Sequence, residues 1–151
     1  MAMESLADKF SDHHKGIRAR DPREAVSGAL HKMLEDVLSE ARVAAQALSP
    51  GAERVCQGVD AYLDACLRRP SLRVLLAALD GYPQALHILK LSKDMHRQQL
   101  AVDLKQMNVP LPETHARLIS AMVRETHRAE CDAGVPLGKF RDLLHQYVGA
   151  L

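Results

Sequence analysis

The residues with the greatest capacity for chemistry are eight histidines and three cysteines, spread along 151 residues. His127 and Cys131 are four residues apart, which is about one helical turn, and Glu130 lies between them. A metal site needs three or four converging ligands, and the spacing supplies no further one. The pattern therefore favours an ordinary helix surface, and the adjacent His13 and His14 favour a solvated turn. No metal and no other cofactor is predicted.

The cysteines give no sign of a nucleophile. Cys56 and Cys66 fall on the apolar stripe of a helix expected after Pro50, where a thiol usually packs as a small hydrophobic group. No histidine stands at a fixed distance from either thiol to lower its pKa, and the sequence holds no GxSxG, GxGxxG, P-loop or HExxH pattern. We therefore predict that the chain is not an enzyme.

The overall composition limits the partners of the chain. The formal net charge is +1, and residues 1–24 hold five basic against five acidic side chains, so independent DNA binding is not expected. No apolar run suggests a membrane span or a signal peptide, so no membrane partner is predicted and a cytoplasmic protein is expected. Tryptophan is absent and aromatic residues make up 3%, which favours an aliphatic, helical core.

Caps, prolines and apolar periodicity predict an all-α fold of about six helices. Asp21-Pro22-Arg23-Glu24 resembles a capping box and starts a long helix that Ser49-Pro50 interrupts, and Ser49-Pro50 repeats the cap-and-proline signal for a second helix. A short helix over 72–79 is apolar on nearly every side and is expected in the middle of the structure. The remaining helices are predicted at about 83–107, 112–133 and 137–148, with Gly134 ending the fifth.

Two segments resemble the effector-binding and dimerisation domain of TetR-family transcription regulators. Residues 61–76, AYLDACLRRPSLRVLL, are similar to the place where an "AYLDxxLxxP" helix meets an "xLRxLL" helix in that family. Residues 116–125, ARLISAMVRE, followed by ECDAGVPL at 130–137, are similar to the run that leads into the final helix of that family. The helix from Asp21 resembles the one that links the DNA-binding head to the body.

The resemblance covers residues 21–151. It implies that these residues form a ligand-binding and dimerisation domain. It implies a homodimer in which the last two helices of each copy form a four-helix bundle. Residues 1–20 are too few for the three-helix head of the family, although residues 10–16 resemble its end, and we interpret them as a short N-terminal segment or a remnant of a head. The apolar stripes of the last two helices can fold back on the domain or meet a partner copy. The resemblance implies the second, with these residues of the stripes at the dimer interface: Leu118, Ile119, Phe140, Leu144 and Tyr147.

The resemblance also implies an effector pocket enclosed by the middle helices. The residues predicted to bind the ligand are those that interrupt an aliphatic interior: Tyr62, Cys66, Tyr82, His87, Met95 and Met122. The sequence around them is rich in Leu, Met and Ala, which favours a small apolar effector. Met95 and Met122 are also typical of residues that fill gaps in a core. The main alternative is a stand-alone interaction protein, an antiactivator or a heterodimer partner of another regulator.

Overall fold

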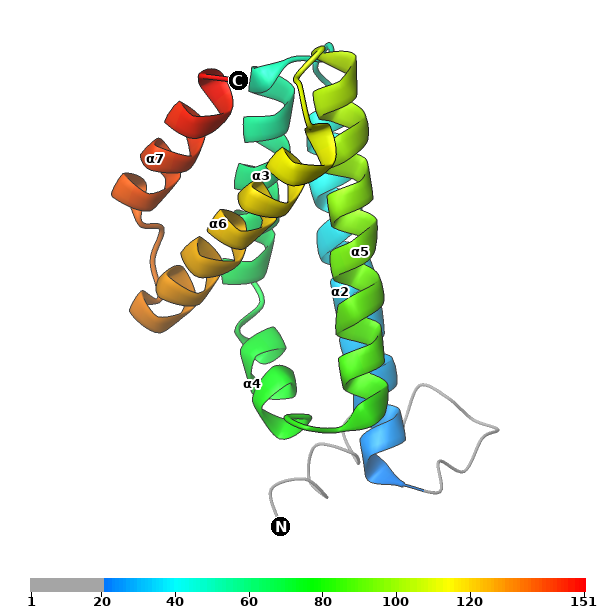
Figure 1. Ribbon diagram of the computed structural model, residues 1–151. Coiled ribbons are helices and arrows are strands. Elements are labelled where there is room, and N and C mark those ends of the chain that lie inside the picture. The colour runs from blue at the N-terminus through cyan, green and yellow to red at the C-terminus, as the bar shows by residue number, and fades with distance from the viewer. Residues whose placement is uncertain (1–20) are drawn as a thin grey trace.

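The computed structural model describes residues 21–151, which form six α-helices and no strand, as predicted (Figure 1). Two interpretations, the head remnant at residues 1–20 and the solvated turn at His13 and His14, lie outside the described residues. The helices are α2 (Pro22–Gln46), α3 (Ala52–Leu67), α4 (Pro70–Ala78), α5 (Pro83–Gln106), α6 (Pro112–Ala133) and α7 (Gly138–Gly149). None of these helices is long and apolar enough to cross a membrane.

Local signals set most of the helix ends. The Asp21 carboxylate accepts a hydrogen bond from the Arg23 backbone N–H at 2.9 Å, so the predicted cap of α2 is confirmed, although the Glu24 side chain makes no return bond within the described chain. The predicted cap at Ser49 is wrong, because α3 begins at Ala52 with the extended Gly51 before it. Gly134 ends α6 in the left-handed conformation, as predicted.

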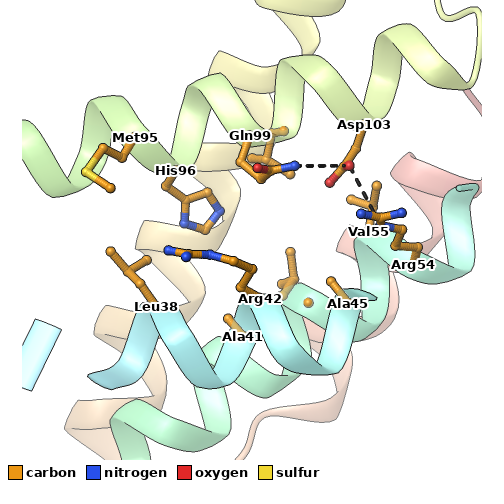
Figure 2. Close-up of a pocket in the computed structure, with 13 residues that line it drawn as sticks. Leu38, Ala41, Arg42, Ala45, Arg54, Val55, Met95, His96, Gln99 and Asp103 are labelled. Carbon is orange, nitrogen blue, oxygen red and sulfur yellow. Dashed lines mark hydrogen bonds and ion pairs between the residues drawn. The ribbon is translucent and has the colours of Figure 1, made fainter. Parts of the chain in front are cut away.

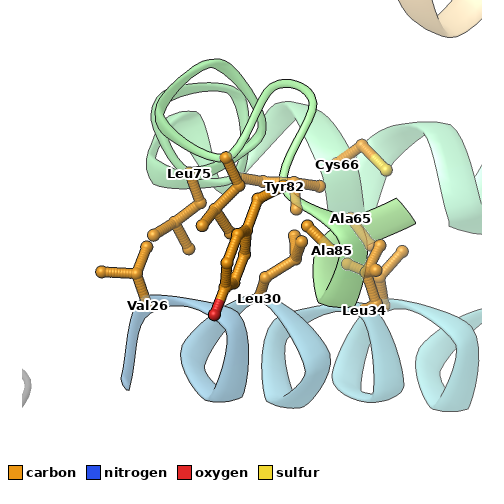
Figure 3. Close-up of a cluster of buried hydrophobic side chains, with 11 residues drawn as sticks. Val26, Leu30, Leu34, Ala65, Cys66, Leu75, Tyr82 and Ala85 are labelled. Atoms are coloured by element: carbon orange, nitrogen blue, oxygen red, sulfur yellow. The ribbon is translucent and has the colours of Figure 1, made fainter. Parts of the chain in front are cut away.

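The helices surround two connected groups of buried side chains. The first group lies between α2, the end of α3, the helix α4 and the start of α5, and contains Leu30, Leu75 and Tyr82 (Figure 3). The second group lies where α3, α5, α6 and α7 meet, and contains Leu63, Leu104, Ile119 and Leu144. Each fully buried leucine stabilises the fold by roughly 1.5–3 kcal/mol.

Two long helices, α2 and α5, are neighbours, and α3 packs along α2 (Figure 1). The helix α6 packs against the C-terminal part of α5 and runs obliquely across α3 toward α7. The short helix α4 lies at one end of the bundle and not in the middle of the structure, so that expectation is wrong (Figure 1). It buries Leu72 and Leu75, but Val74 is 51% exposed because a nine-residue helix at the end of the bundle meets neighbours on one face only.

Two glycines in different backbone conformations give a matched test of the helix boundaries. Gly134 has φ of +71°, so Gly134→Ala is expected to destabilise the chain by about 1–2 kcal/mol. Gly28 lies inside α2, where an added Cβ atom would meet open space, so Gly28→Ala is expected to stabilise by about 0.5–1 kcal/mol. Urea denaturation measures both values. Equal signs for the two substitutions would contradict the assigned conformations.

Candidate ligand-binding pocket

A pocket of about 390 Å³ opens between α2, α3 and α5, beyond the point where the first buried group ends (Figure 2). Its volume lies at the small end of the range for ligand sites, about 300–1,000 Å³. The apolar part of the wall comes from all three helices: Leu38, Ala41, Ala45, Val55, Gly58, Val59, Met95 and Leu100. The polar part consists of Arg42, Arg54, His96, Gln99 and Asp103.

Gly58 brings two walls of the pocket close together. A Cβ atom added there would lie 3.1 Å from the Cβ atom of Ala45, which is closer than about nine in ten contacts of real Cβ atoms. Glycine at position 58 thus permits the close approach of α3 to α2. Glycine weakens a helix interior, so helix propensity does not explain a glycine at this position. The short distance between α3 and α2 does explain it.

One end of the pocket holds an ion pair that is almost fully buried. The Nε atom of Arg54 lies 3.8 Å from Oδ1 of Asp103, and the two side chains are 17% and 8% exposed. The Gln99 amide donates a hydrogen bond of 3.3 Å to the same oxygen. Burial raises the pKa of Asp103 above its usual value, although Arg54 and Gln99 act in the opposite direction. The distance of 3.8 Å is too long for a hydrogen bond, so Arg54 Nε is buried with no hydrogen-bond partner in residues 21–151.

The other polar groups lie on the facing walls. Arg42 extends its guanidinium from α2 across the pocket toward His96 of α5 (Figure 2). Burial lowers the pKa of His96, so this imidazole is neutral at pH 7. On its other side the His96 ring meets the edge of Tyr62, with ring centroids 5.5 Å apart. Tyr62 therefore supports the pocket wall without being part of it.

The six residues predicted to bind a ligand are spread over different environments. Met95 lines the pocket, and Tyr62 packs behind it. Cys66 and Tyr82 belong to the first buried group, with Tyr82 lying across α2 (Figure 3). His87 is exposed on α5, and Met122 is half-buried beside the second group. Of the six, the structure thus places only Met95 in the pocket wall, with Tyr62 directly behind that wall.

Sequence reasoning missed the polar wall of the pocket. One signal was present for Asp103, because it falls on the stripe of α5 that includes the buried Leu100 and Leu104, and a carboxylate on such a stripe needs a partner. No comparable signal marks Arg42 or Arg54. Both lie on the helices α2 and α3, and only the packing of these helices turns the two side chains toward α5.

The cysteines and the residues considered for metal binding have other surroundings. Burial raises the pKa of the Cys66 thiol to about 12, and burial also raises the pKa values of Cys56 and Cys131. Glu130 is bound by Arg141 instead of pointing to an ion with His127 and Cys131. Within the described part of the chain, no three His, Cys, Asp or Glu side chains are arranged to hold a metal ion.

A buried network centred on Arg141 ties α7 to α6 and α3. Arg141 donates from Nε and Nη2 to the two oxygens of Glu130 at 2.7 and 2.8 Å, and from Nη1 to Asp64 at 2.8 Å. The Leu137 backbone N–H donates to Glu130 at 2.9 Å. Burial alone would raise the pKa of Glu130, but these hydrogen bonds outweigh it and the pKa is lowered. The network positions α7 beside α3, so it is a structural element.

The five residues predicted for the dimer interface divide into two sets. Ile119 and Leu144 are fully buried in the core of a single chain. Leu118 and Phe140 are exposed, and so is Leu143, which was not predicted. Tyr147 is half-buried, and its hydroxyl forms a 2.7 Å hydrogen bond with His115 Nδ1. The exposed set leaves apolar side chains available on both α6 and α7.

Comparison with known proteins adds no relative: no family model matches the sequence, and no curated protein and no solved structure matches it.

Proposed function

We propose that the chain is the effector-binding and dimerisation module of a TetR-like transcription regulator. The observation that carries the proposal is the pocket between α2, α3 and α5, which combines an apolar wall with a few oriented polar groups. In this proposal, α2 corresponds to the helix that, in the family, links the DNA-binding head to the body. The pocket lies between α2 and α5, so its width depends on how far apart these helices lie. A ligand that binds better at one separation shifts the chain toward the conformer with that separation, and this shift is the proposed regulatory switch.

The second part of the proposal is a homodimer formed through α6 and α7. The exposed apolar side chains on these helices, Leu118, Phe140 and Leu143, support it. The burial of these apolar side chains against a second copy would remove them from water, which is favourable. The proposal assigns no DNA-reading role to residues 21–151.

The dimer is tested by Phe140→Glu, which is expected to convert a dimer into a monomer. Phe140 is 42% exposed in the single chain, so a carboxylate there is tolerated by the monomer but would be desolvated in the interface. The matched control is Leu86→Glu, a similarly exposed position on α5, which is expected to remain dimeric. Light scattering coupled to size exclusion measures the mass. A wild-type chain that is monomeric at all concentrations would contradict this part of the proposal.

The same exposed side chains also favour a second function, a stand-alone regulator that pairs with a different protein through α6 and α7. This alternative predicts a monomeric wild-type chain that acquires a heterologous partner. The mass measurement separates the two, because homodimerisation would occupy the surface that such a partner needs.

A further inference from the structure

The charges around the pocket between α2, α3 and α5 do not balance. Two guanidinium groups line it, those of Arg42 and Arg54, and one carboxylate, that of Asp103. His96 adds no charge at neutral pH because it is buried as the neutral imidazole. The wall therefore carries one excess positive charge beside an apolar surface.

The excess charge belongs to Arg42. Asp103 already compensates Arg54 at 3.8 Å, whereas Arg42 makes no ion pair or hydrogen bond with any side chain of residues 21–151. Arg42 is exposed, and its guanidinium lies along the open side of the pocket, beside His96 (Figure 2). A planar guanidinium in this position is suited to bind a carboxylate with two parallel hydrogen bonds.

The other guanidinium of the pocket is engaged within the chain. Arg54 Nε faces Oδ1 of Asp103 at 3.8 Å, so Asp103 rather than a ligand compensates the charge of Arg54 (Figure 2). Between the two arginines the wall is aliphatic, with Ala41, Ala45 and Val59 contributing to it. A ligand that lies along the pocket thus contacts the Arg42 guanidinium at one end and the aliphatic wall along the rest of its length.

We infer that the pocket binds a small amphipathic monoanion, a carboxylate attached to an aliphatic body, with Arg42 as the residue that selects the charge. This inference rests on the proposed effector-binding function and narrows the ligand class. The volume of about 390 Å³ limits the ligand to a small molecule. One negative charge neutralises the wall, whereas a cation would add to the repulsion and a neutral alcohol would leave Arg42 unpaired.

The test titrates the full chain calorimetrically with three probes of one length: octanoate, 1-octanol and octylamine. Octanoate is expected to bind once per chain, at least about tenfold more tightly than 1-octanol, and octylamine is expected not to bind. Arg42→Gln is expected to lower octanoate affinity by at least about tenfold and to leave 1-octanol affinity unchanged. The matched control is Arg117→Gln, which removes the same charge from an exposed site on α6.

Methionine methyl NMR locates the binding site in the same samples. The methyl signal of Met95, which lines the pocket, is expected to shift with octanoate, and that of Met122, which does not line it, is expected to stay. Equal or tighter binding of 1-octanol would overturn the inference and leave an effector-binding module standing. Binding of none of the probes, or binding that shifts only Met122, would overturn the inference, and the mass of Phe140→Glu would still decide the dimer independently.

Discussion

Arg141→Met is expected to lower the free energy of unfolding by roughly 3–5 kcal/mol. Glu130 is fully buried, and Arg141 supplies hydrogen bonds to both of its carboxylate oxygens. Without the guanidinium, the carboxylate keeps only the Leu137 backbone N–H, which does not replace the lost hydration of a charge. Methionine preserves much of the side-chain volume, so the loss reports on the ion pair. Urea denaturation followed by circular dichroism measures it.

Two further variants separate burial from charge. Arg128→Met removes an arginine that pairs with Glu125 on the surface of α6, where both side chains are more than half exposed, and is expected to leave stability unchanged within error. The double variant Glu130→Met/Arg141→Met removes both buried charges and is expected to recover most of the stability lost in the single variant. If Arg141→Met cost no more than Arg128→Met, Glu130 would have to be hydrated in solution.

The pH dependence of Arg141→Met follows from the direction of the Glu130 pKa. In the native chain this pKa is lowered on folding, so the contribution of Glu130 is present above the unfolded pKa and is lost as pH falls through the folded pKa. Without Arg141, burial dominates and raises the folded pKa, which reverses the sign. The stability difference between wild type and variant is therefore expected to be largest near pH 7 and to shrink as pH falls toward about 4. A difference independent of pH would contradict an ionised Glu130.

The helices were predictable because the signals that start and end them are local. Pro22, Pro83 and Pro112 each stand at the first position of a helix, and Gly134 takes the positive φ that ends α6. The position of α4 was not predictable in the same way. An apolar sequence indicates how much of a helix can be buried, but the number of neighbours depends on where the bundle ends.

The pocket was largely unpredictable because its polar residues become neighbours only through packing. Arg54 and Asp103 are on different helices, and no spacing rule connects them. Periodicity correctly marked Tyr62 and Cys66 as interior residues. It did not distinguish a side chain that fills the core from one that faces a pocket, because both interrupt an aliphatic stripe in the same way. That distinction depends on how far apart α2 and α5 lie.

Leu144→Ala is expected to destabilise the chain by about 2–5 kcal/mol, whereas Leu143→Ala next to it is expected to have almost no effect on a monomer. Leu144 is fully buried in the core shared by α3, α5, α6 and α7, and Leu143 is 61% exposed. Truncation of Leu144 therefore leaves a cavity inside one protomer, although the apolar stripe of α7 had predicted this residue for the dimer interface.

Protein concentration distinguishes the two roles of α7. A cavity within the protomer destabilises equally at every concentration, whereas a lost interface contact weakens association, so its cost depends on how much dimer is present. The Leu144→Ala loss is expected to be the same in denaturation curves recorded at widely different chain concentrations. A loss confined to high concentration would place Leu144 in the interface after all. A concentration-dependent loss in Leu143→Ala would instead identify the exposed side of α7 as the surface that meets the second copy.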